Sequence, residues 1–191
     1  MAKTVAKTVA GIAIALAIGA QMVGVRAAGA AGATPFAVTS PAFADGGPLP
    51  TSSEYGGGFG CHGSNRAPTL TWRGVPAGVR SFALAVVDPD AAPFAAGGWV
   101  HDVVYDIPAA ARALDATTLA RSTSGTNSFG TRAFGGPCPP AGGQPHHYVF
   151  TLYALGVARL SGHALTRDAL LRAMAGHIVG AASIVGTFSR L

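Results

Sequence analysis

The chain has 191 residues, of which 49% are hydrophobic and only 11% are charged. This length suits a single domain with one core and excludes a large multidomain assembly. The formal net charge is +5, but both lysines lie in the first seven residues and the arginines further along are scattered. No basic patch therefore predicts binding to nucleic acid.

Residues 1–30 have the pattern of a secretory signal peptide. Lys3 and Lys7 form a basic segment, an apolar stretch follows from Val9 to Val25, and small residues near 27–33 offer a cleavage site. The alternative is an uncleaved N-terminal membrane anchor, although the apolar run is short and glycine-rich for a membrane span. No cysteine lies just after this run, which disfavours a lipid anchor there. We expect a secreted or periplasmic protein, with residues 34–191 forming one domain.

The chain has two cysteines, Cys61 and Cys138. An even number of cysteines in an exported chain favours a disulfide. The alternative is a pair of buried free thiols. A metal site built on two isolated cysteines is not expected.

The elements predicted in chain order are mainly strands. Alternating or continuous apolar runs with β-branched and aromatic residues predict strands at 36–40, 69–72, 81–87, 99–107, 146–153 and 182–188. Glycine and proline mark residues 41–68 as loop, and 122–129 form a polar loop. A helical turn is predicted at 109–114. A helix is predicted at 167–175, capped by Thr166 and ended by Gly176. The expected fold is mostly β and antiparallel, with a few short helices, one of them near the C-terminus.

Three predicted strands each bring a titratable group to the end of an apolar face. Asp88 shares the parity of the apolar residues in 81–87, and strict alternation in 99–107 would place His101 among apolar neighbours. His146 begins the strand that follows a loop rich in proline and glycine, and Tyr148 lies on the same face. The sequence thus predicts that these four side chains meet in one pocket.

Residue chemistry alone leaves two interpretations of this set. Histidines and a tyrosine hydroxyl can donate to an anion, with an aspartate holding one imidazole. Alternatively, two histidines and a carboxylate can hold a metal ion. Each residue also has an ordinary structural explanation: Asp-Pro-Asp is commonly a turn, and a strand histidine is commonly part of a core. No nucleophile elbow, phosphate-binding loop, zinc-protease helix or dinucleotide fingerprint is present.

Several segments in a fixed order carry a resemblance to a known family. They are Gly60-Cys61-His62-Gly63-Ser64-Asn65, Ala67 to Trp72, Asp88-Pro89-Asp90, Trp99 with His101, Asn127 to Gly130, Gly135 to Pro140, Pro145-His146-His147-Tyr148 and the tail from Ala181 to Phe188. With these segments the chain resembles the phosphatidylethanolamine-binding proteins, in the bacterial branch described as Raf-kinase-inhibitor-like (YbhB/YbcL type).

The resemblance implies two antiparallel sheets with short helices and a small anion pocket. It transfers the pocket role to a set of seven residues: Asp88, Asp90, His101, Gly136, Pro140, His146 and Tyr148. Two departures affect this transfer. Ala67 stands where a serine is usual, and the segment from Asp90 to Pro93 has one residue more than usual, which puts a pocket role for Pro93 in doubt.

We therefore expect an exported, non-catalytic binding protein for phosphate, a phospholipid head group or a similar small anion. We expect no metal and no cofactor. The family name suggests a kinase or a protease as a protein partner. The alternatives are a hydrolase or other enzyme that uses Asp88, His101 and His146, and an interaction protein with a vestigial pocket.

Overall fold

The computed structural model describes residues 34–191, so the predicted signal peptide lies outside the described residues. Eight strands form two antiparallel sheets, as the sequence predicted. The small sheet has the order β1-β2-β5, with β1 at Ala37–Thr39, β2 at Leu70–Arg73 and β5 at Ala113–Leu114. Within residues 34–191, no helix is long and apolar enough to cross a membrane.

The large sheet has the strand order β6-β4-β3-β7-β8, and all of its neighbours pair antiparallel. Its strands are β3 at Ser81–Asp88, β4 at Trp99–Pro108, β6 at Thr123–Ser124, β7 at His146–Leu155 and β8 at Ile178–Phe188. Four short helical elements complete the fold: η1 at Thr51–Ser53, η2 at Pro89–Ala91, α1 at Ala116–Leu119 and α2 at Arg167–Met174.

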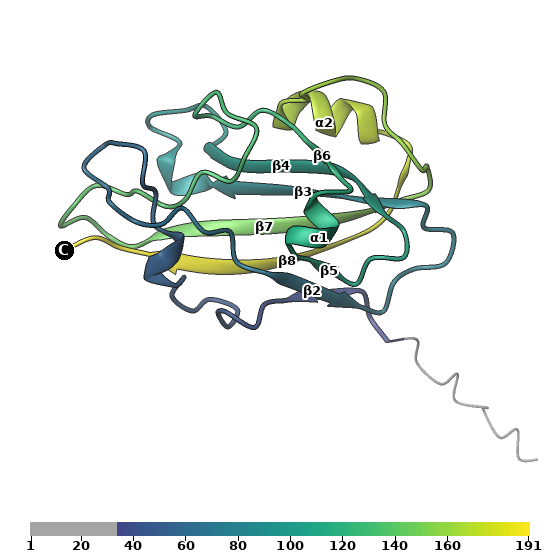
Figure 1. Cartoon of the computed structure of the whole chain (residues 1–191), viewed down its shortest axis with the longest axis horizontal. Coiled ribbons are helices and arrows are strands. Elements are labelled where there is room, and N and C mark those ends of the chain that lie inside the picture. The colour runs from purple at the N-terminus through teal and green to yellow at the C-terminus, as the bar shows by residue number, and fades with distance from the viewer. Residues whose placement is uncertain (1–33) are drawn as a thin grey trace, which may run out of the picture. The chain divides into compact units, whose positions relative to one another are not determined.

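The large sheet buries apolar side chains on both faces. One face packs on the small sheet through Trp72, Phe82 and Phe150, and the other packs under α2 through Tyr105 and Leu170. Figure 1 shows α2 above the large sheet and the strands β2 and β5 below it. Burial on both faces explains the almost continuous apolar run of β3.

The predicted positions of the main strands are confirmed, with different bounds at the last one. β8 begins at Ile178 and pairs with β7 along its whole length, whereas the sequence predicted a strand only from 182. The helical turn predicted at 109–114 is wrong. Ala113 and Leu114 instead pair with β2, and the helical residues begin later, at Ala116.

The strict alternation predicted for residues 99–107 is also wrong. The pairing of β3 with β4 shifts register twice, once beside His101 and once near Asp106, which has a φ of 54°. Each irregularity adds a residue to β4 and reverses the side-chain parity beyond it. As a result Asp102 is on the face of the large sheet that packs on the small sheet, beside Leu84 and Val86 of β3. Val103 is on the opposite face, which packs against α2.

Candidate ligand-binding site

A cavity of about 310 Å³ lies where β3 ends and where β4 and β7 begin. Four of the seven residues predicted for the pocket line it: Asp88, His101, Pro140 and His146. The other lining residues are mostly apolar: Phe59, Ala91, Phe94, Trp99, Phe129, Cys138, Pro139 and Arg190. Residues separated by more than fifty positions in the chain thus share one small cavity, and three of them are titratable groups at strand ends.

Asp88 and His146 form a hydrogen-bonded pair inside this cavity. His146 Nδ1 donates to Asp88 Oδ2 at 2.7 Å, and the Asp88 side chain is only 5% exposed. The other carboxylate oxygen, Oδ1, accepts from the backbone N–H groups of Asp90 and Ala91 at the start of η2. The pair fixes the orientation of the imidazole and leaves Nε2 as the ring nitrogen that can meet a ligand.

His101 is held by the backbone and is neutral at physiological pH. Its Nδ1 lies 2.6 Å from the carbonyl oxygen of Gly135, so Nδ1 carries the proton and donates. Burial lowers the pKa of His101 below its usual value, and the hydrogen bond to Gly135 and the charge of Asp88 only partly oppose this effect. Nε2 is buried and has no hydrogen-bond partner among the described residues. In the neutral ring that nitrogen is an acceptor.

Tyr148 supports the cavity from behind and does not line it. Its ring is 1% exposed and meets the His101 ring edge to face, with centroids 5.0 Å apart. Burial raises the pKa of Tyr148 above its usual value, and the negative charge of Asp88 adds to the rise. The hydroxyl is therefore protonated, and it has no hydrogen-bond partner within residues 34–191.

Asp90 and Gly136 lie outside the cavity lining. Asp90 Oδ2 accepts from both the backbone N–H and Nδ1 of the exposed His147, at 2.7 and 2.8 Å. Gly136 is buried, and a Cβ at this position would lie 1.8 Å from the carbonyl oxygen of Ser53. Gly136 is thus required by a close backbone approach. Pro93, which the sequence placed in doubt, does not line the cavity either.

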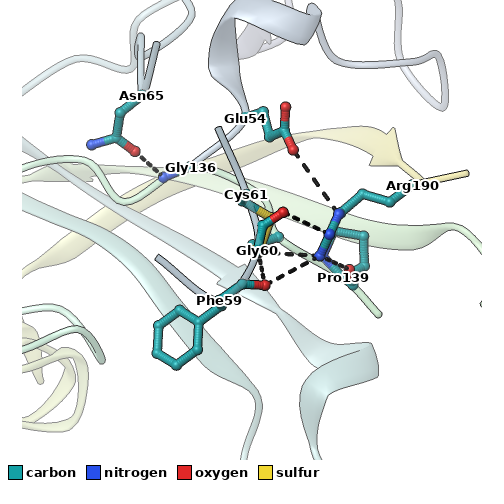
Figure 2. Close-up of a disulfide and its surroundings, with 9 residues drawn as sticks. Glu54, Phe59, Gly60, Cys61, Asn65, Gly136, Pro139 and Arg190 are labelled. Carbon is teal, nitrogen blue, oxygen red and sulfur yellow. Dashed lines mark hydrogen bonds and ion pairs between the residues drawn. A yellow bond between two sulfur atoms is a disulfide. The ribbon is translucent and has the colours of Figure 1, made fainter. Parts of the chain in front are cut away.

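A half-buried asparagine, Asn65, anchors the loop that contains Gly136. Asn65 Oδ1 accepts from the Gly136 N–H at 2.6 Å, and its Nδ2 donates to the Phe134 carbonyl at 2.7 Å. Figure 2 shows the first of these bonds beside the disulfide. Asn65 has a φ of 52°, a conformation that asparagine adopts more readily than most residues. The loop that delivers Pro139 and Pro140 is therefore held at its start.

The disulfide predicted between Cys61 and Cys138 is present, with the two Cα atoms 6.0 Å apart. It ties the loop before Asn65 to the loop that lines the cavity. Arg190, which the sequence analysis did not identify, binds across the same junction. Its guanidinium donates to the carbonyls of Phe59, Gly60 and Pro139, and its Nε lies 4.0 Å from Glu54 Oε1 (Figure 2).

An aromatic rim surrounds the polar groups and was also missed by the sequence analysis. Phe59 and Phe94 are 73% and 72% exposed, and Phe129 packs edge to face on Trp99. No period-2 pattern marks Phe59 or Phe94, because both lie in loops. The site therefore combines two imidazoles and a carboxylate with an apolar entrance, a composition typical of a small-molecule pocket.

Among the described residues, no three His, Cys, Asp or Glu side chains are grouped so that they could hold a metal ion. Asp88 and His146 are already bonded to each other, and His101 Nδ1 is bonded to the backbone.

Comparison with known proteins supports a common family. The family model described as phosphatidylethanolamine-binding protein matches residues 39–189. The chain is 44% identical to the UPF0098 protein YbcL of Escherichia coli over 136 residues, which cover 67% of this chain and 73% of YbcL. It is 43% identical to "Putative lipoprotein LppC" of Mycobacterium tuberculosis over 157 residues, which cover 82% of this chain and 73% of LppC.

Solved structures give the same relationship. One match is the crystal structure of E. coli YbcL, described as a new member of the mammalian PEBP family. It has a TM-score of 0.75 and 37% identity, and the match covers 82% of this chain and 99% of that YbcL chain. A Chlamydia trachomatis homologue matches with a TM-score of 0.72 and 32% identity, covering 82% of this chain and 98% of the homologue. With its two-sheet fold and the matched segment from 39 to 189, the chain belongs to the phosphatidylethanolamine-binding protein family.

Proposed function

We propose that the protein is an exported, non-catalytic binding protein whose cavity holds a phosphate group, either free or as the head group of a lipid. The observation that carries this proposal is that the Asp88–His146 pair and His101, whose Nε2 has no partner in the described domain, line the same cavity. Nδ1 of His146 is bonded to Asp88, so Nε2 is the nitrogen that meets the ligand, and in the protonated ring Nε2–H donates to a phosphate oxygen.

The sequence interpretation had the histidines donate to the anion, but Nε2 of the neutral His101 is an acceptor. An acceptor nitrogen beside a donor nitrogen suits a phosphate that still carries one proton, since its P–OH can donate to His101 Nε2 while P–O⁻ accepts from His146. A monoester or inorganic phosphate can supply such a hydroxyl. A phosphodiester head group lacks it and can only accept from His146, so it should bind more weakly. The exposed aromatic rings of Phe59 and Phe94 would then lie beside the apolar part of the ligand.

The lining residues favour binding over turnover. Of the residues that line the cavity, none is a serine or a threonine, and Cys138 is engaged in the disulfide. A hydrolase would have to use water activated by the Asp88–His146 pair, which is a feasible general base. Catalysis by this pair therefore remains the competing function to be tested.

Two further elements of the proposal concern location and partners. The signal-peptide pattern and the similarity to "Putative lipoprotein LppC" both support a location in or beyond the cell envelope. The aromatic rim at the cavity entrance would be the natural surface for a protein partner, such as a kinase or a protease.

Calorimetry with inorganic phosphate and phosphoethanolamine tests the proposal. His146→Ala should lose binding worth about 1–3 kcal/mol, because it removes a charge-assisted donor. His163→Ala is the matched control, since His163 is exposed and does not line the cavity, and its affinity should be unchanged.

Turnover of an aryl phosphate and a carboxylic ester should be measured on the same two variants. Equal phosphate affinity in both variants would contradict the proposed site. Turnover that is present in the native protein and lost in His146→Ala would replace the binding function with a hydrolase.

A further inference from the structure

A second cavity, of about 180 Å³, lies between the two sheets and shares no lining residue with the first. Its walls are apolar side chains from both sheets and from one loop: Leu70, Leu84, Val86, Leu114, Phe134 and Phe150. Helix α1 covers it with Ala116 and Leu119, and none of the four α1 residues is buried. The cover therefore does not fill the space beneath it.

Asp102 is the buried charged group among these apolar side chains. It is 6% exposed, and within the described domain its carboxylate accepts one hydrogen bond, from the backbone N–H of Val103 to Oδ1 at 2.9 Å. Oδ2 accepts no hydrogen bond within residues 34–191, and it is not among the fully enclosed side-chain atoms that lack a partner there, so a small donor can reach it. A carboxylate with so little exposure is costly to keep charged unless such a donor satisfies the free oxygen.

The charge of the wall has one sign. The only titratable lining residues are Asp102 and Asp115, and the lining contains no lysine, arginine or histidine. Asp115 lies at the exposed rim, where its Oδ1 caps α1 by accepting from the Thr118 N–H. A ligand that complements this wall has an apolar body and carries a positive charge or a strong donor.

We propose that this cavity binds a small organic ammonium ion with an apolar body, with Asp102 as its counter-ion. The volume fits such a ligand, because an apolar protein cavity of about 150 Å³ holds a benzene molecule. The ammonium group would donate to Oδ2 of Asp102 and the hydrocarbon part would contact Leu84 and Phe150. Burial raises the pKa of Asp102 to about 7, so the carboxylate is available as a partner from neutral pH upward.

This site is independent of the phosphate proposal, and its test can be separated from it. Benzylamine is the probe and benzyl alcohol is its neutral counterpart of similar shape. At pH 8, calorimetry on the exported protein should show benzylamine binding that is at least tenfold tighter than benzyl alcohol binding. Amide chemical shifts should move at Leu70, Leu114 and Phe150, and phosphate should not compete.

Asp102→Asn keeps the side-chain shape and should weaken benzylamine binding at least tenfold, with phosphate affinity unchanged. Asp168→Asn is the matched control: it removes a carboxylate from α2 that lines neither cavity, and benzylamine affinity should stay the same. The proposal is overturned if benzylamine does not bind, if Asp102→Asn binds it as tightly as the native protein, or if phosphate displaces it.

Discussion

Asp88 uses both of its carboxylate oxygens within the protein. Oδ1 accepts hydrogen bonds from the backbone N–H groups at the start of η2, and Oδ2 accepts a hydrogen bond from His146 Nδ1. A single residue at the end of β3 therefore shapes the turn that follows it and orients an imidazole 58 positions later in the chain. The same arrangement explains why Asp90, two residues on, points away from the cavity and binds His147 instead.

Asp102 is the residue whose ionisation should affect stability most. Burial raises its pKa to about 7 from 3.8, so between these values the folded protein keeps a proton that the unfolded chain has lost. The free energy of unfolding should therefore fall as pH rises from about 4 to 7 and stay low above that. Asparagine does not titrate, so the free energy of unfolding of Asp102→Asn should not fall in this way. At pH 8 the variant should be more stable than the native protein by roughly 2–4 kcal/mol.

Thermal unfolding of native protein and Asp102→Asn at pH 4 and pH 8 measures this difference, since the other carboxyl groups cancel between the two proteins. The melting temperatures should agree at pH 4 and separate at pH 8. A constant difference at both pH values would show that Asp102 does not titrate in this range. Asp168→Asn, whose side chain is exposed, should show no such separation.

At the scale of elements, two of the loops that line the first cavity are cross-linked to each other. The segment at 59–61 and the segment at 138–140 are joined by the disulfide and by the guanidinium of Arg190, which donates to carbonyls on both. Loops of this composition have little secondary structure of their own, so their positions depend on these cross-links. The same cross-links therefore stabilise the folded chain and fix the positions of two loops that line the cavity.

Replacing both Cys61 and Cys138 by alanine should lower stability and phosphate affinity together. The cross-link joins residues 77 positions apart, and its loss should cost roughly 4–5 kcal/mol by the chain-entropy model. Urea unfolding and calorimetry with phosphate check the two effects.

Arg190→Met is a second variant, with the disulfide intact: it removes the hydrogen bonds to the carbonyls, the contact with Glu54 and one positive charge of the cavity lining. It should reduce stability less than the double cysteine variant. Phosphate affinity unchanged in both variants would mean that the loops hold their positions without this junction.

At the scale of the whole molecule, the large sheet serves as a common wall. The larger cavity, at Asp88, lies at the end of its face toward the small sheet, and the smaller cavity, at Asp102, lies on the same face. Its other face is closed by α2 through Leu170 and Met174. The two cavities are therefore built on a rigid support that runs through the domain (Figure 1).

The predicted export of the molecule can be tested directly. The basic segment, apolar run and small residues of the first 33 positions predict that the mature chain begins between Ala28 and Thr34. N-terminal sequencing of protein recovered from the periplasm or the medium should give a start in this interval. An intact Met1 in the membrane fraction would support an uncleaved anchor instead.

The sequence by itself determined the features that depend on local or binary patterns. Continuous or alternating apolar runs identified β3, β4 and β7, and Thr166 with the apolar spacing after it identified α2. The parity of Asp88 with Phe82, Leu84 and Val86 placed a carboxylate at the end of an apolar face. The even cysteine count indicated the disulfide. These signals lie within a few residues of the chain or in its composition, so no packing is needed to interpret them.

Tertiary structure alone decided the features that depend on contacts between distant residues. The two irregularities in β4 arise from pairing with β3 and turn Asp102 into the core. Arg190 joins the site because β8 runs antiparallel to β7 and so brings the C-terminus beside the loops at 59–61 and 138–140. The proton on His101 is assigned by the Gly135 carbonyl. Periodicity cannot predict these features, because register shifts, loop closure and hydrogen-bond partners are set by long-range packing.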